Sequence, residues 1–104
     1  MQRGEVWWAE LPKPAGRRPV VILSRDRAIQ VREYVTVAEL TRTIRNIPVE
    51  VLLGLDDGLP VKCVVNLDVI NTIPKKLLVD RITILKGKKM TAIELALKFA
   101  LVLS

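Results

Sequence analysis

RRPVVILS, residues 17–24, contains an uninterrupted apolar run that begins at a proline and follows two arginines. Five consecutive apolar residues, 19–23, predict a central strand that is covered on both faces, and proline is tolerated at the first position of such a strand. We therefore expect a buried strand over residues 19–23. Arg18 then lies at the point where this strand emerges from the core.

Further strands are expected on either side of this run. Segments rich in valine, threonine and aromatic residues predict strands over residues 3–10, 34–40, 49–53, 61–67 and 78–85. The pair Asp57-Gly58 predicts the turn of a hairpin between the strands 49–53 and 61–67. Trp7 and Trp8 point to opposite faces of the first strand, and alternation alone does not say which of them enters the core.

Three helical segments complete the expected fold. Short turns are expected over residues 26–31 and 72–77, and apolar residues recur at helical spacing over residues 88–103. The apolar stripe of this last helix is wider than one face, so we expect it to be covered by its own sheet and by a second copy of the chain. The fold class expected is mainly β (α+β), a small, twisted, partly closed antiparallel barrel with a C-terminal helix.

Length and composition predict one domain over residues 1–104. Half of the 104 residues are apolar, and no composition shift marks a linker. A core of this size gains noticeably from a second subunit, which also favours a homodimer. No signal peptide or membrane-spanning stretch is expected, and the lone Cys63 fits a buried position in a reducing compartment. We therefore expect a cytoplasmic protein that does not associate with a membrane.

The net charge of +6 is concentrated in residues 13–45. That window alone contributes +5, because it contains eight basic residues and only three acidic ones. Most of its arginines lie near the predicted ends of strands, where they can converge on a polyanion, and their planar forks suit phosphate. A solvated basic surface is the simpler interpretation for Arg25, Arg27 and Arg32, but not for the whole set.

The absence of histidine excludes several kinds of chemistry. With no histidine and one cysteine, the chain has neither a zinc site nor an imidazole acid-base pair. The pair Asp56-Asp57 is better explained by its turn than by a magnesium site, so we expect no metal and no cofactor. The chemistry left open is one that RNA partly performs on itself, in which the ribose 2′-hydroxyl attacks the adjacent phosphorus.

Several segments, in order, resemble the MazF/PemK (Kid-type) toxins of type II toxin-antitoxin systems. Residues 3–7 and 18–24 are similar to the first two strands of that family, and residues 37–41 to the strand that ends in its functional threonine. Residues 72–75, with Arg81-Ile82, are similar to its later strand-and-turn signature. The resemblance covers nearly the whole chain. It implies an SH3-like or CcdB-like barrel, a homodimer, and a metal-independent endoribonuclease that is neutralised by an antitoxin.

The resemblance also places the catalytic residues of the family. Its arginine, held to stabilise the pentacoordinate phosphate and to take part in proton transfer, falls on Arg18, and its threonine falls on Thr41. Asp68 lies where related toxins carry a functional acid. Glu39 is a general-base hypothesis of ours that the family does not supply. It rests on the period of two that places Glu39 on the same strand face as Thr41.

Each of these residues also has a purely structural interpretation. Arg18 can form a salt bridge at the rim, Thr41 can cap a backbone group at the strand end, and Asp68 can cap a turn. The loop of residues 11–16 is shorter than in many relatives, in which it gates the RNA groove. This difference leaves substrate gating open.

RNA contacts are assigned from charge and from expected proximity to Arg18 and Thr41. The residues in this set are Arg17, Ser24, Arg25, Arg42, Thr43 and Arg45. Most of them are expected to contact phosphate, and to set affinity and salt dependence more than sequence choice. Trp7, Trp8 and Tyr34 are possible stacking platforms for the bases of single-stranded RNA.

Two other functions are compatible with the same residues. One is a barrel that binds nucleic acid, or only an antitoxin, without cleaving RNA. The other is a gyrase-inhibiting toxin of the CcdB fold, which acts by protein contact. Such a toxin does not need Arg18 and Thr41, so alanine substitutions at these positions separate it from a ribonuclease.

Overall fold

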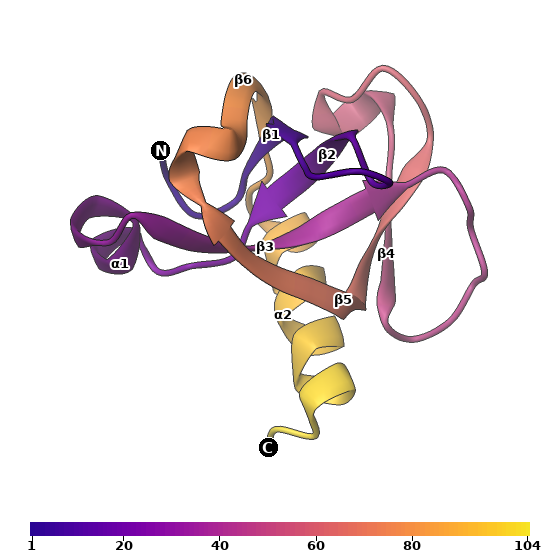
Figure 1. Ribbon diagram of the computed structural model, residues 1–104. Coiled ribbons are helices and arrows are strands. Elements are labelled where there is room, and N and C mark those ends of the chain that lie inside the picture. The colour runs from indigo at the N-terminus through magenta and orange to yellow at the C-terminus, as the bar shows by residue number, and fades with distance from the viewer.

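The computed structural model describes all residues 1–104 and contains one curled sheet of six antiparallel strands and one long helix (Figure 1). The strand order is β4-β5-β3-β2-β1-β6. The helices, α2 included, all lack the length and apolar character needed to cross a bilayer. In chain order the elements are β1 (Glu5–Glu10), β2 (Arg17–Ile22), α1 (Asp26–Val31), β3 (Tyr34–Thr41), β4 (Glu50–Leu53), η1 (Leu55–Asp57), β5 (Cys63–Pro74), η2 (Lys75–Leu77), β6 (Leu78–Ile84) and α2 (Lys88–Leu101).

Strand β2 lies between β1 and β3 and is buried on both faces, as its apolar run predicts. Val20, Val21 and Ile22 are all fully buried. Val20 and Ile22 belong to a smaller core cluster that includes Ile29 of α1, whereas Val21 belongs to the larger cluster that includes Ile93 of α2. In Figure 1, α2 crosses one face of the curled sheet and its C-terminal end projects beyond the sheet.

The two edges of the sheet approach each other through η1 and β6. The hydroxyl of Thr83 on β6 donates a hydrogen bond to the carbonyl oxygen of Asp57 at 3.0 Å. Gly58 follows with a φ of +86°, and a Cβ at this position would lie 2.4 Å from the Thr83 hydroxyl. Only glycine fits this close approach at a left-handed backbone position. The contact joins the chain after β4 to β6 and confirms the predicted partly closed barrel.

Strand β5 differs most from the sequence prediction, because it continues to Pro74 instead of ending at Leu67. Its register with β3 pairs Ala38 with Ile70 but Leu40 with Val65, so β5 carries additional unpaired residues between these two pairs. This bulge bends β5, so that the strand changes direction between its two neighbours, β3 and β4. The helical turn expected over residues 72–77 is reduced to η2 for the same reason.

Glu5, the one buried charged residue, joins β1 to β6. It is 8% exposed, and its Oε1 accepts hydrogen bonds from the backbone N–H of Gln2 and from Nε1 of Trp7, both at 3.0 Å. Its Oε2 accepts a hydrogen bond from Nε of Arg81 at 3.0 Å. Burial by itself raises the pKa of Glu5, but these hydrogen bonds to the ionised form outweigh it, so that the pKa lies below its ordinary value of 4.5.

We expect Glu5→Gln to destabilise the protein by about 1–2 kcal/mol at pH 7, because a charged hydrogen-bond acceptor is replaced by a neutral one. Since folding lowers the pKa of Glu5, its contribution is complete above the unfolded-state pKa and is lost as the pH falls through the folded-state pKa. The difference between wild type and variant in thermal unfolding should therefore shrink below about pH 4.5. Glu33→Gln, at an exposed position, is the control. If the difference in thermal unfolding between wild type and Glu5→Gln stayed constant from pH 7 to pH 3, the lowered pKa of Glu5 would be contradicted.

Candidate active site

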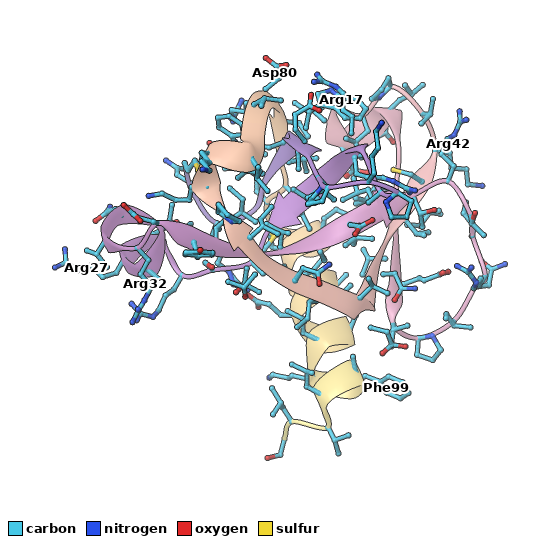
Figure 2. The ribbon with its side chains drawn as sticks, in the orientation of Figure 1. Arg17, Arg27, Arg32, Arg42, Asp80 and Phe99 are labelled. Carbon is cyan, nitrogen blue, oxygen red and sulfur yellow. The ribbon has the colours of Figure 1, made fainter.

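A cleft of about 550 Å³ opens at the end of the sheet where β2 begins and β3 ends. Figure 2 shows Arg17 and Arg42 at this end of the molecule, and Arg27 and Arg32 of the α1 region on the opposite side. Three arginines, two threonines and a set of apolar residues surround the cleft, and no carboxylate does. The lining residues are Trp8, Arg17, Arg18, Pro19, Leu40, Thr41, Arg42, Thr43, Leu59, Pro60, Val61, Cys63 and Ile82.

The register of β2 and β3 brings Arg18 and Thr41 together. The paired residues end at Val20 and Glu39, and continuing the same antiparallel register by two residues places Arg18 opposite Thr41. Beyond Val20 and Glu39 the two strands no longer pair, whereas β3 continues to pair with β5 on its other edge as far as Thr41 and Val64. The cleft opens at this separation, with Arg18 on one strand end and Thr41 on the other.

Arg18 is held by one hydrogen bond and forms no ion pair. Its Nε donates to the carbonyl oxygen of Ala15 at 3.1 Å, in the loop before β2. The terminal guanidinium nitrogens bond to no other group of the chain. The alternative of a rim salt bridge is therefore wrong for Arg18. The side chain is oriented by its inner nitrogen and presents its outer nitrogens for an anion.

The hydroxyl of Thr41 caps a backbone group, as the structural interpretation of this residue predicts, but its hydrogen is still free to be donated. Its Oγ1 accepts a hydrogen bond from the backbone N–H of Thr43 at 3.2 Å. This bond uses a lone pair and leaves the hydroxyl hydrogen available. The cap also turns the chain after β3, and Arg42 and Thr43 line the cleft beside Thr41.

Arg17 and Arg42 differ in how their charge is compensated. Arg17 donates to Glu10 at 2.7 Å and to Asp80 at 3.0 Å, and the hydrogen bond to Asp80 followed by that to Glu10 raises the pKa of the Arg17 guanidinium. Figure 2 shows Arg17 and Asp80 at the same end of the molecule. Arg42 makes no such ion pair. Arg18 and Arg42 are therefore the two uncompensated positive charges of the cleft.

Three of the expected RNA-contact residues lie outside the cleft. Ser24 and Arg25 follow the opposite end of β2, where the Ser24 hydroxyl accepts a hydrogen bond from the backbone N–H of Thr36 and Arg25 precedes α1. The expected proximity of these two residues to Arg18 and Thr41 is wrong, because the full length of β2 intervenes. Arg45 lies in the β3–β4 loop, where its backbone N–H donates to Glu50 at 2.9 Å.

Glu39 and Asp68 do not line the cleft either. Glu39 pairs with Val20, before the two strands separate, and its carboxylate has no hydrogen-bond partner. Asp68 lies exposed in the bulge of β5, and its backbone N–H donates to the side-chain oxygen of Asn66 at 2.9 Å. Asp68 therefore lies within a bent strand, and Asn66 supplies the local cap that was expected of Asp68.

The apolar wall of the cleft was not predicted from the sequence. Leu59, Pro60 and Val61 belong to the turn region between β4 and β5, and the closure of the barrel brings them to the cleft beside Ile82 of β6. The buried Cys63 also lines the cleft, and burial, followed by the charge of Asp57, raises the pKa of its thiol. Only the turn signal at Asp57-Gly58 pointed to this segment, and it carries no information on where the turn lies relative to Arg18.

Comparisons with known proteins agree with this fold. Residues 2–101 match the family model described as PemK-like, MazF-like toxin of type II toxin-antitoxin system. The chain is 44% identical over 99 residues to the probable endoribonuclease MazF5 of Mycobacterium tuberculosis (strain ATCC 25618 / H37Rv), an alignment that covers 94% of this chain and 90% of that protein.

Two solved structures from mycobacteria superpose closely on this one. A mycobacterial endoribonuclease in complex with its cognate antitoxin is 32% identical, has a TM-score of 0.90, and is matched over 100% of this chain and 97% of its own. The Mycobacterium tuberculosis toxin MazF-mt6 is also 32% identical, with a TM-score of 0.88 over 96% of this chain and 98% of its own. The chain belongs to the PemK-like, MazF-like family of toxins of type II toxin-antitoxin systems.

Proposed function

We propose that this toxin is an endoribonuclease that cleaves single-stranded RNA at short sequences without a metal ion, and that a cognate antitoxin neutralises it. Endoribonuclease is the activity given for its relatives, and one similar structure is an endoribonuclease bound to its antitoxin. The observation that carries the assignment of the site is that Arg18 and Thr41 line the same cleft, beyond the last paired residues of β2 and β3. We place its action in the cytoplasm, where RNA substrates are found.

The reaction begins with attack of a ribose 2′-oxygen on the adjacent phosphorus. The P–O2′ bond forms while the P–O5′ bond breaks, which leaves a 2′,3′-cyclic phosphate on one product and a 5′-hydroxyl on the other. Negative charge develops on the non-bridging oxygens in the transition state. The outer nitrogens of Arg18, which have no partner in the chain, can bond two of these oxygens at once.

Thr41 orients the phosphate from the opposite strand end. Its hydroxyl accepts from Thr43 and can donate its hydrogen to a phosphate oxygen. No carboxylate lines the cleft, so we assign the proton transfers to water and to the arginine-bound phosphate, and assign no step to Glu39 or Asp68. Arg18 acts as an electrostatic stabiliser in this mechanism, because its guanidinium offers hydrogen-bond donors and no acceptor.

The antitoxin is expected to present an acidic, partly disordered segment to this cleft. Arg18 and Arg42 offer two uncompensated charges, and carboxylates on a flexible chain would occupy the positions of the RNA phosphates. Neutralisation then results from direct competition for the same cations.

We expect Arg18→Ala to reduce cleavage of a long defined RNA by about 10²–10³-fold, since it removes the main donor to the transition-state charge. Thr41→Ala should cause a loss of roughly tenfold, because one hydrogen bond from an uncharged donor to the phosphate is removed. The measurement is mapping of new 5′ ends with purified, antitoxin-free protein in the presence of EDTA. Arg18→Lys, which keeps the charge but not the fork, should recover only part of the activity.

Three outcomes would contradict this assignment in different ways. Intact RNA after incubation with the folded wild-type protein would indicate a binding module. Toxicity that survives both alanine substitutions would indicate a gyrase-directed or other protein target. A Glu39→Gln variant that loses cleavage would return the general base to Glu39, whereas unchanged cleavage would remove that hypothesis.

Arg42 should contact phosphate and not a base. We expect Arg42→Gln to weaken binding of single-stranded RNA at low salt and to reduce the slope of log affinity against log salt concentration by about 0.7. Arg27→Gln is the matched control, because it removes the same charge on the opposite side of the molecule (Figure 2). Equal effects of the two substitutions would indicate a general effect of net charge.

A homodimer is proposed from the exposed face of α2 and β4. Leu95 and Phe99 are 62% and 61% exposed, and with Leu52 and Pro48 they line a groove of about 430 Å³. Glu50 also lines this groove, and its buried Oε2 makes no hydrogen bond but lies 3.9 Å from Nη1 of Arg45. An exposed apolar face of this kind fits contact with a second copy that covers the groove.

We expect Phe99→Asp to convert a dimer to a monomer, because a charge placed in an apolar interface is not compensated. Size-exclusion chromatography with light scattering measures the mass directly. Val31→Asp is the control, since Val31 is 58% exposed on α1, outside the groove. A wild-type protein that is monomeric at high concentration would contradict the proposed dimer.

A further inference from the structure

The cleft has an apolar half to which the proposed chemistry assigns no role. Three arginines and two threonines form its polar part, and the apolar part includes Trp8, Pro19, Leu59, Pro60, Val61 and Ile82. Proteins that bind single-stranded nucleic acid combine cations for the backbone with aromatic and apolar surfaces for unstacked bases. The two halves of this cleft have that combination, so the apolar half is suited to a nucleobase.

Trp8 is the only aromatic residue of the cleft, and its indole is held in place. The guanidinium carbon of Arg17 lies 5.1 Å from the centroid of the Trp8 ring, within the range of a cation–π contact. In the sheet, Trp8 pairs with Pro19 of β2 on one side and with Asp80 of β6 on the other. Neighbours on both sides therefore restrict the ring, so little entropy is lost when a base stacks on it.

Arg17 is poorly placed to bind phosphate. Its guanidinium bonds to Glu10 from β1 and to Asp80 from β6, so a phosphate would have to displace two carboxylates. These bonds instead hold the guanidinium over the indole ring. Arg17 differs in this respect from Arg18 and Arg42, which line the same cleft without an ion pair.

The other two aromatic candidates lie elsewhere. Trp7 packs against the core cluster on the other face of the sheet and donates its Nε1 to Glu5. Tyr34 lies at the start of β3, where it pairs with Pro74, at the opposite end of that strand from Thr41. Neither side chain lines the cleft.

We propose that Trp8 is the stacking platform for the nucleobase next to the scissile phosphate, and that Arg17, held by Glu10 and Asp80, is a positioning residue for the Trp8 indole. This inference rests on the proposed ribonuclease function. Since every base has a π face, Trp8 selects for an unstacked single strand and contributes affinity without reading the identity of the base.

The two tryptophans of the chain allow a direct test by fluorescence. Trp7→Phe leaves Trp8 as the only tryptophan, and Trp8→Phe leaves Trp7. Each variant is titrated with 2′-O-methyl octaribonucleotides, one for each base, in which the attacking hydroxyl is blocked. Saturable quenching is expected in Trp7→Phe and little change in Trp8→Phe. Binding without a change in Trp8 emission would overturn the proposal.

Kinetics provide a second readout that does not depend on emission. Trp8→Leu should weaken substrate binding roughly 5- to 150-fold and change kcat much less, and Trp8→Tyr should recover most of the loss. Trp7→Phe is the control outside the cleft. Equal losses of affinity in Trp8→Leu and Trp8→Tyr would overturn stacking, because tyrosine keeps a π face and leucine does not.

The role of Arg17 is tested by salt dependence. In a Trp7→Phe background, Arg17→Met should reduce the quenching of Trp8 and leave the salt slope of binding unchanged. A direct phosphate contact instead predicts that the slope falls by about 0.7, and this result would overturn the positioning role. The proposed function and this inference fail separately. Absence of cleavage by the wild type contradicts the first, whereas cleavage that depends on Arg18 with unquenched Trp8 contradicts only the second.

Discussion

Burial of β2 on both of its faces is the constraint on which the rest of the structure depends. Val20, Val21 and Ile22 lie between two separate core clusters, so the strand has no freedom to slip against β1 or β3. A slip by one residue would move each side chain to the wrong cluster. The same register that satisfies the core sets Arg18 opposite Thr41. The position of the site is thus a consequence of core packing several residues away.

The separation of β2 and β3 turns this register into a cleft. Past Val20 and Glu39 the two strands no longer pair, although β3 continues to pair with β5 on its other edge. Arg18 and Thr41 lie beyond the last paired residues of the two strands, so both can face a ligand in the cleft. The closure of the barrel, through the Thr83 contact with η1, then supplies the opposite apolar wall. The sheet therefore orients the side chains of both walls of the cleft.

The arginines of the cleft show how neighbouring charges of one type acquire different tasks. Arg17 is compensated by two carboxylates and lies beside an aromatic ring, whereas Arg18 is tied only by its inner nitrogen and keeps its outer nitrogens free. The difference comes from strands β1 and β6, which bring Glu10 and Asp80 to one arginine and not to its neighbour. Counting positive charge along the chain treats the two residues as equivalent.

The sequence by itself determined where most of the strands and helices lie and which kinds of catalysis are excluded. Periodicity located the strands, because burial of alternate or consecutive residues leaves a local pattern, and the lack of histidine ruled out imidazole catalysis. It also placed Arg18 and Thr41 at strand ends. The tertiary structure alone decided which strand ends meet. The length of β2 separates Ser24 and Arg25 from the cleft, and the bend in β5 places Asp68 outside the cleft. The fold also pairs Arg17 with Asp80, which is 63 residues away in the sequence. Register, bulges and ion pairs between distant strands depend on contacts that no local pattern records.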